Sequence, residues 1–240
     1  MKGIFKFIKL LLQSLIGSQD DIIKEDVNTI EVKEEENNKS LKKLILEYIE
    51  ENNIILDEIL LIGIRDSSKL KKDVINDYLG YITRNELFLA PGTTDPGVYY
   101  YENPMNDKGT FHLKTKFHKN IWCFGKHRGY EALVNDWRYC LPTEGWRDAN
   151  FNFEFDEDDI TVKGHYGINF HRMHPINIVN KIGRYSAGCQ VVQDPKHFEK
   201  ILNRCKQTNK YKSPGKSIYS YLLLDIRQIP NGLLQRHLKS

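Results

Sequence analysis

Residues 164–192 read GHYGINFHRMHPINIVNKIGRYSAGCQVV, and the rest of the chain is organised around this stretch. The run Ile168-Asn169-Phe170 leads into His171 and predicts a strand. After a loop of fourteen residues, the small-residue turn Ser186-Ala187-Gly188 leads into Cys189. A strand, a loop and a tight turn in this order can bring the imidazole of His171 beside the thiol of Cys189.

Cys189 and His171 are the candidate catalytic pair. A thiol with its ordinary pKa of about 8.5 is mostly protonated at neutral pH, so it needs a base or a positive neighbour to act as a nucleophile. The three small side chains before the thiol let backbone N–H groups approach whatever the sulfur attacks. We therefore expect the N–H groups of Gly188 and Cys189 to form an oxyanion hole, with Ser186 in the same turn.

Short strand-like runs separated by turn residues fill most of the chain after residue 54. Turn signals such as Pro91-Gly92 and Asp95-Pro96-Gly97 divide them. Many short strands at this spacing predict a mainly β domain, a sandwich or a barrel-like fold, with a few flanking helices. The predicted strands are 59–64, 78–83, 86–90, 98–101, 110–114, 121–124, 130–134, 160–162, 167–171 and 219–226.

Three helices are predicted around this β-rich region. Residues 1–17 have lysines at helical spacing among Ile, Phe and Leu, which indicates an amphipathic helix. Ser40 is expected to cap a second helix that ends at Asn52-Asn53, and Asp194-Pro195 to begin a third that ends near residue 204. Residues 18–40 are acidic and polar and are typical of a linker. The predicted organisation is therefore helix 1–17, linker 18–40 and domain 41–240.

The predicted helix over residues 1–17 has several interpretations. Its longest unbroken apolar run, residues 10–12, is too short for a membrane span or for the core of an ordinary signal peptide. The helix would lie on a membrane surface, bind a protein partner, or pack on its own domain. A degenerate secretion signal that ends near Gly17-Ser18 is a further alternative.

Composition excludes some classes of function. With 40% hydrophobic and 28% charged residues the chain is typical of globular proteins. A net charge of +3, without a dense run of Lys and Arg among aromatics, does not indicate a nucleic-acid-binding protein. The spacing of Cys123, Cys140, Cys189 and Cys205 matches neither a zinc ribbon nor a disulfide framework. A reduced compartment, with three buried thiols and one nucleophile, is the simpler interpretation.

The spacing from His171 to the segment Ser186-x-Gly188-Cys189 resembles the signature of the L,D-transpeptidase (YkuD-type) family, His-x(14 to 17)-[Ser/Thr]-His-Gly-Cys. This chain has Ala187 where the family has His, and Val191 where the family has Arg or Asn. It is more similar to a divergent branch, common in bacteriophage genomes, in which Ser-x-Gly-Cys-Gln replaces the standard motif. The resemblance covers roughly residues 58–203, because similar segments occur at 63–65, 93–97, 127–129 and 132–134.

The resemblance implies that Cys189 is the nucleophile and His171 its base, in a fold that needs no metal and no cofactor. The implied substrates are peptidoglycan stem peptides. Arg172 and Arg184 flank the pair in the sequence and could hold a substrate carboxylate bidentately. His127, in the segment Gly-Lys-His-Arg-Gly, is a further candidate for substrate binding.

Two metal sites are alternatives to this interpretation. His165, His171, His174 and Cys189 carry ligands that suit zinc, and an even spacing would put His165 and His171 on one strand face, but their spacing matches no compact zinc motif. Acidic and amide residues alternate over 148–159 as in a calcium loop. Phe153 occupies the position that needs glycine for the sharp turn, so a solvated acidic loop is predicted there.

Two functions remain open at the level of the sequence. One is an enzyme that transfers an acyl group from a stem-peptide bond through a Cys189 thioester, either to an amine, which makes a cross-link, or to water, which is hydrolysis with a lytic role. The other is a binding or virion structural module that keeps the fold without turnover, which the changes at Ala187 and Val191 motivate. The first would act in the cell envelope, and either would fit a virion or an infected host cell.

Overall fold

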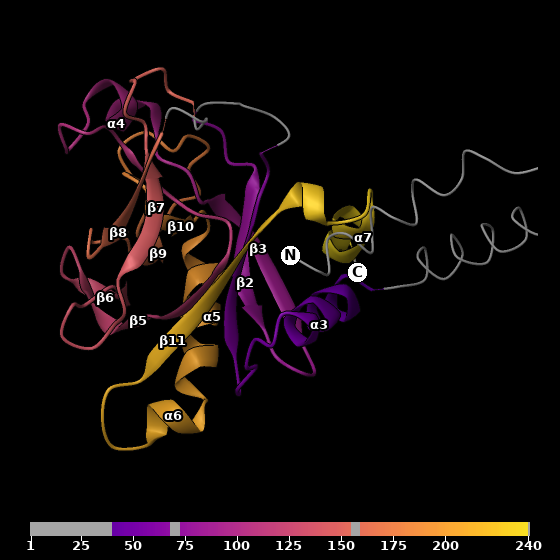
Figure 1. The fold of residues 1–240 in the computed structure, drawn as a ribbon. Coiled ribbons are helices and arrows are strands. Elements are labelled where there is room, and N and C mark those ends of the chain that lie inside the picture. Colours follow the sequence, from indigo (N-terminus) through magenta and orange to yellow (C-terminus); the bar gives the residue numbers. More distant parts are fainter. Residues whose placement is uncertain (1–39, 68–72, 155–158, 240) are drawn as a thin grey trace, which may run out of the picture. The chain divides into compact units, whose positions relative to one another are not determined.

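The computed structural model describes residues 40–67, 73–154 and 159–239 (Figure 1). The predicted amphipathic helix over 1–17 and nearly all of the predicted linker lie outside these residues. The described chain forms two compact units, residues 40–55 with 230–239, and residues 56–229. The second unit contains Cys189, His171 and all the strands.

The first unit consists of two helices, α3 (Leu41–Glu51) and α7 (Leu233–Lys239), which pack against each other. The side chain of Ser40 accepts a hydrogen bond from the N–H of Lys43 at 3.2 Å, so the predicted N-cap is confirmed. Buried residues Leu41, Ile45 and Ile49 recur every four positions on one face of α3. The helix ends where the sequence predicted, with Asn52 as its C-cap.

The second unit is built on a closed barrel of eight strands, which confirms the predicted mainly β fold. The barrel order is β1-β11-β5-β6-β9-β10-β3-β2. The pairs β1–β11 and β9–β10 are parallel, and the remaining neighbours are antiparallel. The strands are β1 (Leu60–Arg65), β2 (Asp77–Ile82), β3 (Leu87–Thr93), β5 (Phe117–His127), β6 (Tyr130–Val134), β9 (Phe170–Arg172), β10 (Gln190–Val192) and β11 (Ile218–Asp225).

A second sheet of three strands stands beside the barrel in the order β4-β7-β8, all antiparallel. Its strands are β4 (Phe111–Leu113), β7 (Thr143–Arg147) and β8 (Ile160–Gly164). Four short helical segments complete the unit: α4 (Val98–Glu102), α5 (Pro195–Lys206), α6 (Asn209–Lys212) and the 3-10 turn Ile226–Gln228. The side chain of Asp194 accepts from the N–H of Lys196, which confirms the predicted start of α5.

The core of this unit is aromatic and aliphatic. Trp122, Phe170 and Tyr221 pack ring against ring, with centroids 4.7 to 6.5 Å apart. The buried face of α5, with Phe198 and Ile201, belongs to the same cluster. This core fixes β9 and β10, because the indole Nε1–H of Trp122 donates to the carbonyl of Ile168 at 2.8 Å, two residues before β9.

The prediction of a strand over residues 98–101 was wrong, and the sequence did not predict the two strands β7 and β10. Residues 98–101, with high β-propensity, form the helix α4, because Gly97 caps it and donates its N–H to the carbonyl of Ser186 at 2.9 Å. A Cβ at Gly97 would lie 2.0 Å from the carbonyl oxygen of Gly183, so only glycine allows this approach. The missed strands are short: β7 has five residues and only one that is β-branched, and β10 has three residues, too few for a period to show. The predicted strand 167–171 begins three residues later, at Phe170.

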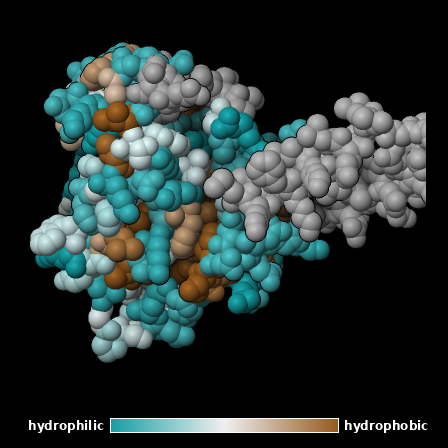
Figure 2. All heavy atoms as spheres, viewed as in Figure 1, coloured by the Kyte–Doolittle hydropathy of each residue, from teal (hydrophilic) through white to brown (hydrophobic). Residues whose placement is uncertain are grey.

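On the face shown in Figure 2 the surface is mainly hydrophilic, and hydrophobic residues are gathered in separate patches. Among the described residues, no helix has the length and apolar character needed to cross a membrane.

Candidate active site

The turn before Cys189 is held by its own serine. The hydroxyl of Ser186, fully buried, donates to the carbonyl of Cys189 at 2.8 Å and accepts from the N–H of Gly188 at 3.2 Å. Gly188 has a φ of +111°, and a Cβ there would lie 2.5 Å from the carbonyl oxygen of Phe111. The N–H of Gly188 is thus used inside the turn, whereas that of Cys189 has no partner among the described residues and is the remaining candidate donor for an oxyanion.

The side chain after Cys189 anchors the turn to the barrel core. The amide of Gln190 donates to the carbonyls of Gly188 and Thr94, both at 3.3 Å, and its oxygen accepts from the hydroxyl of Tyr221 at 2.8 Å. All of these polar groups are buried, and each bond replaces one that water would otherwise make. The position of the sulfur is therefore fixed from inside the barrel.

The thiol of Cys189 is neutral at rest. Burial raises its pKa to about 11, although the N–H of Asn169 and the charge of Arg128 lower it. The sulfur accepts from the N–H of Asn169 at 3.4 Å and donates its own hydrogen to the carbonyl of Gly167 at 3.6 Å. No direct hydrogen bond joins the sulfur to His171 among the described residues.

His171 is also neutral, and its tautomer follows from its contacts. Its Nδ1–H donates to the carbonyl of Arg172 at 2.8 Å, so the lone pair lies on Nε2. Nε2 is buried and has no hydrogen-bond partner in the structure. Burial is the main reason that the pKa of His171 is lowered to about 3, and the nearby charge of Arg128 lowers it further. The imidazole is therefore unprotonated over the whole physiological range, and in this buried state it is a weaker base than free imidazole.

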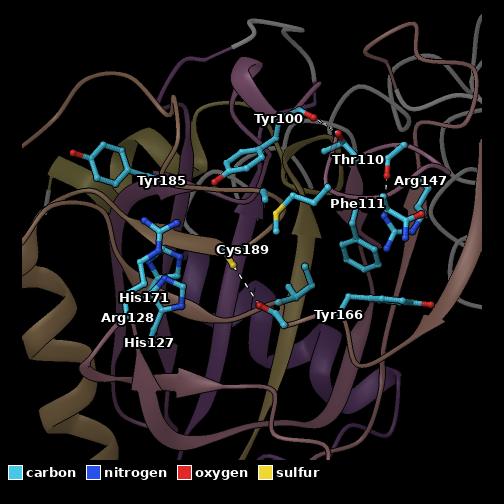
Figure 3. Close-up of a pocket in the computed structure, with 16 residues that line it drawn as sticks. Tyr100, Thr110, Phe111, His127, Arg128, Arg147, Tyr166, His171, Tyr185 and Cys189 are labelled. Atoms are coloured by element: carbon cyan, nitrogen blue, oxygen red, sulfur yellow. Dashed lines mark hydrogen bonds between the residues drawn. The ribbon is translucent and has the colours of Figure 1, made fainter. Parts of the chain in front are cut away.

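Cys189 and His171 line one cavity of about 410 Å³, which we call the thiol cavity (Figure 3). Adjacent parallel strands bring them together: β10 begins directly after Cys189, and Val191 pairs with His171 on β9. In Figure 3 the sulfur lies between His171 and His127 with Arg128 on one side and Phe111, Tyr166 and Arg147 on the other. The cavity therefore lies between the barrel and the three-stranded sheet.

His127 stacks directly on His171, with ring centroids 4.0 Å apart and an angle of 12° between the rings. The side chain of Asn169 orients His127: its oxygen accepts from the N–H of Asn135 at 3.0 Å, so its NH₂ group faces Nδ1 of His127 at 3.1 Å. The proton of neutral His127 is therefore on Nε2. His127 can therefore donate from Nε2, and the stacked ring of His171 can accept at Nε2. Both rings line the thiol cavity.

The structure separates the two arginines predicted to bind substrate. The guanidinium of Arg172 lies 4.2 Å from the ring centre of Tyr130 and does not line the thiol cavity, so its predicted role has no geometric support. Arg184 lines a neighbouring cavity of about 400 Å³, where its guanidinium lies 3.9 Å from the ring centre of Tyr99. Arg128, which the sequence did not single out, lines both cavities.

A buried polar network lies close to the Cys turn. Arg65 donates to Thr94 and to the carbonyl of Leu113, both at 2.8 Å, and pairs with Asp95 at 3.1 Å. Burial alone would raise the pKa of Asp95, but His112 and Arg65 hold it at about 2. Because Thr94 also accepts from Gln190, segments 63–65 and 93–97 both support the turn.

Three further residues of the site were missed by the sequence analysis: Asn169, Tyr130 and Arg147. Asn169 stands inside the run that leads into His171, so its place in the motif was a usable signal. The hydroxyl of Tyr130 donates to the carbonyl of Arg172 at 3.2 Å, next to Nδ1 of His171. Arg147 comes from β7, a strand that the sequence did not reveal, and no local pattern marked it.

The described residues contain no group of three or more His, Cys, Asp or Glu side chains that could hold a metal ion. The expectation that His165 and His171 share a strand face was wrong, because His165 follows β8 and donates to the side chain of Asn135 at 2.9 Å. In the acidic loop, the carboxylate of Asp148 accepts from the backbone N–H groups of Asn152 and Phe153, both at 3.1 Å.

Comparison of the chain with protein-family models, with curated proteins and with solved structures finds no match.

Proposed function

We propose that this protein is a cysteine acyltransferase that acts on peptide bonds of peptidoglycan stem peptides. The observation that carries the proposal is the pairing, in one cavity, of the Cys189 thiol with an imidazole whose buried Nε2 has no partner. A buried lone pair without a partner is costly for stability, and His171 is the residue with such a nitrogen that lines the same cavity as the thiol, which supports the proposal. The spacing of the two residues in the sequence supports the substrate class.

The proposed reaction is general-base catalysis rather than attack by a preformed thiolate, because both groups are neutral at rest. As the sulfur attacks the scissile carbonyl carbon, its proton moves to Nε2 of His171 and a C–S bond forms. The carbonyl oxygen becomes an oxyanion and accepts from the N–H of Cys189. Collapse of this intermediate breaks the C–N bond, and His171 returns the proton to the leaving amine.

The thioester that results is released by a second acyl acceptor. An amine gives a cross-link and water gives hydrolysis, and in both cases His171 takes the proton of the incoming nucleophile. The thiol cavity, at about 410 Å³, has room for a peptide segment.

The test is to incubate the full-length protein with purified muropeptides and analyse the products by mass spectrometry. We expect new cross-linked or shortened products with the wild type and a mass increase on the protein that corresponds to the thioester. Cys189→Ala should abolish both, while Cys205→Ala, which removes a buried thiol remote from the cavity, should keep both. Equal activity in Cys189→Ala would refute the proposal.

A second candidate is a binding module without turnover, favoured by one observation: the sulfur donates to Gly167 and not to His171. This module would bind the same peptides in the thiol cavity and leave them intact. Saturable binding with unchanged muropeptides and no protein adduct would identify it.

A further inference from the structure

Among the described residues, no acidic side chain lines either cavity at the site. The residues that line the thiol cavity include Arg128 and Arg147, and those that line its neighbour include Arg128 and Arg184, but no Asp or Glu lines either. Among the described residues, arginine–carboxylate pairs are formed by Arg65, Arg138 and Arg227, and not by the cavity arginines. Among the residues that the structure describes, no carboxylate therefore forms an ion pair with Arg128, Arg147 or Arg184.

The two cavities are adjacent and share part of their walls. Tyr100, Met105 and Arg128 line both, so a ligand that reaches from one into the other passes between these three side chains. We call the second one, with Arg128 and Arg184, the arginine cavity. Arg128 stands at the junction, where its charge also lowers the pKa of Cys189 and of His171.

Arg184 is held in a fixed direction by its neighbours. Its guanidinium lies 3.9 Å from the ring centre of Tyr99 and donates to the hydroxyl of the same ring. The backbone carbonyl of Arg184 accepts from the hydroxyl of Tyr100 at 3.4 Å. A guanidinium that is oriented by an aromatic ring keeps donors for a second planar group, and a carboxylate matches the fork of donors that arginine presents.

We propose that the arginine cavity is a carboxylate subsite: Arg128 and Arg184 bind a free carboxylate of the acyl donor while its scissile carbonyl lies at Cys189. This rests on the proposed function and sharpens it, because it makes a peptide acid the preferred substrate over the corresponding carboxamide. The uncharged amide cannot form charge-assisted bonds with the guanidinium groups. Both arginines are exposed, so the preference should weaken as salt screens the charges.

The test compares two synthetic stem peptides that differ only in whether their carboxylates are free or converted to carboxamides. The rate of thioester formation on the full-length protein is followed by intact-mass spectrometry. No amine acceptor is added, so the rate reports only the reaction with the acyl donor. We expect the acid to react at least about tenfold faster than the amide, equivalent to about 1.4 kcal/mol. Raising the salt concentration to about 0.5 M should reduce the ratio.

Arg184→Gln should lower the rate for the acid to within about twofold of that for the amide and leave the amide unchanged. Arg184→Lys should retain part of the preference, and Arg138→Gln, an exposed arginine paired with Asp136 and remote from both cavities, should retain all of it. Equal rates for the two peptides with the wild type, or an equal loss for both peptides in Arg184→Gln, would overturn the subsite.

If neither peptide forms a thioester, acyl transfer fails, but the subsite is still tested through binding. Titration of Cys189→Ala with both peptides by calorimetry should then give a Kd for the acid at least about tenfold below that for the amide. The double variant Cys189→Ala with Arg184→Gln should lose this difference. No binding, or equal Kd values for the two peptides, would refute the subsite independently of the chemistry.

Discussion

The reactivity of Cys189 is set by two opposing effects at the sulfur. Burial disfavours the thiolate, while the N–H of Asn169 and the charge of Arg128 favour it, and burial is the larger effect because the pKa is raised to about 11. Burial also dominates at His171, but there it lowers the pKa, because the charged form of an imidazole is the protonated one. The pair is thus uncharged at neutral pH.

This balance predicts how Cys189 reacts with iodoacetamide. The alkylation rate should rise about tenfold for each pH unit between about pH 7 and 10, because only the thiolate reacts and its fraction grows at that rate below the pKa. Arg128→Gln should slow the reaction at each pH by roughly two- to fivefold, since a favourable charge is lost. Peptide mapping by mass spectrometry measures the rate at Cys189 separately from those at the other cysteines.

Arg138→Gln serves as the control, because this arginine pairs with Asp136 away from the thiol cavity. A rate that already reaches a plateau near neutral pH would show a stabilised thiolate and contradict the neutral resting pair.

At the scale of single elements, the turn from Ser186 to Cys189 depends on a backbone conformation that glycine alone adopts easily. Gly188 combines a φ of +111° with the close approach of the Phe111 carbonyl, which comes from β4 of the second sheet. The turn is therefore packed between the barrel and the small sheet, so a distortion at Gly188 moves the sulfur and the free N–H of Cys189 together.

Gly188→Ala should lower the free energy of unfolding by about 3 kcal/mol or more and abolish thioester formation, because the added methyl group adds a clash to an unfavourable φ. Gly129→Ala is a matched control: φ is +90°, but nothing lies within 4 Å of the position that its added methyl group would take. This variant should lose only about 1 kcal/mol. Urea unfolding measures both variants, and equal losses would show that the contact with Phe111 does not constrain the turn.

At the scale of the whole molecule, three histidines are buried in their neutral form. Burial lowers the pKa of His112 and of His118 to about 4 and that of His171 to about 3. In the unfolded chain each would titrate near about 6.5, so unfolding below that pH takes up a proton at each of them. Asp77 acts in the opposite direction, because burial and the charge of Asp95 raise its pKa to about 7.

Stability should therefore fall as the pH is lowered from about 6.5 towards about 4. Three histidines gain a proton on unfolding and Asp77 releases one, which leaves a net uptake of about two protons, or about 3 kcal/mol per pH unit. Urea unfolding at several pH values across this range gives the slope. His118→Gln should reduce the slope by about one proton, and a flat profile over this range would contradict neutral burial of the histidines.

The sequence by itself predicted the class of the fold, which the structure confirms, and the candidate pair Cys189 and His171. Alternating apolar residues and turn signals are local, so they predicted most strands and the starts of α3 and α5. The motif around Cys189 and His171 likewise lies within one stretch of chain. The helix α4 was wrongly predicted as a strand, because its conformation depends on Gly183 and Ser186, which are distant in the sequence.

Only the tertiary structure decided the charge states of Cys189 and His171, which backbone N–H groups of the turn are free, and which residues line the cavities. Burial of Cys189 and His171 is a property of the closed barrel, and it sets both pKa values. The Gly188 N–H is occupied because the hydroxyl of Ser186 folds back onto the turn. Arg128, Arg147 and Arg184 come from separate parts of the chain, and only the tertiary structure brings Arg128 and Arg147 to the thiol cavity and Arg128 and Arg184 to the arginine cavity. Such long-range packing leaves no periodic signal in the sequence.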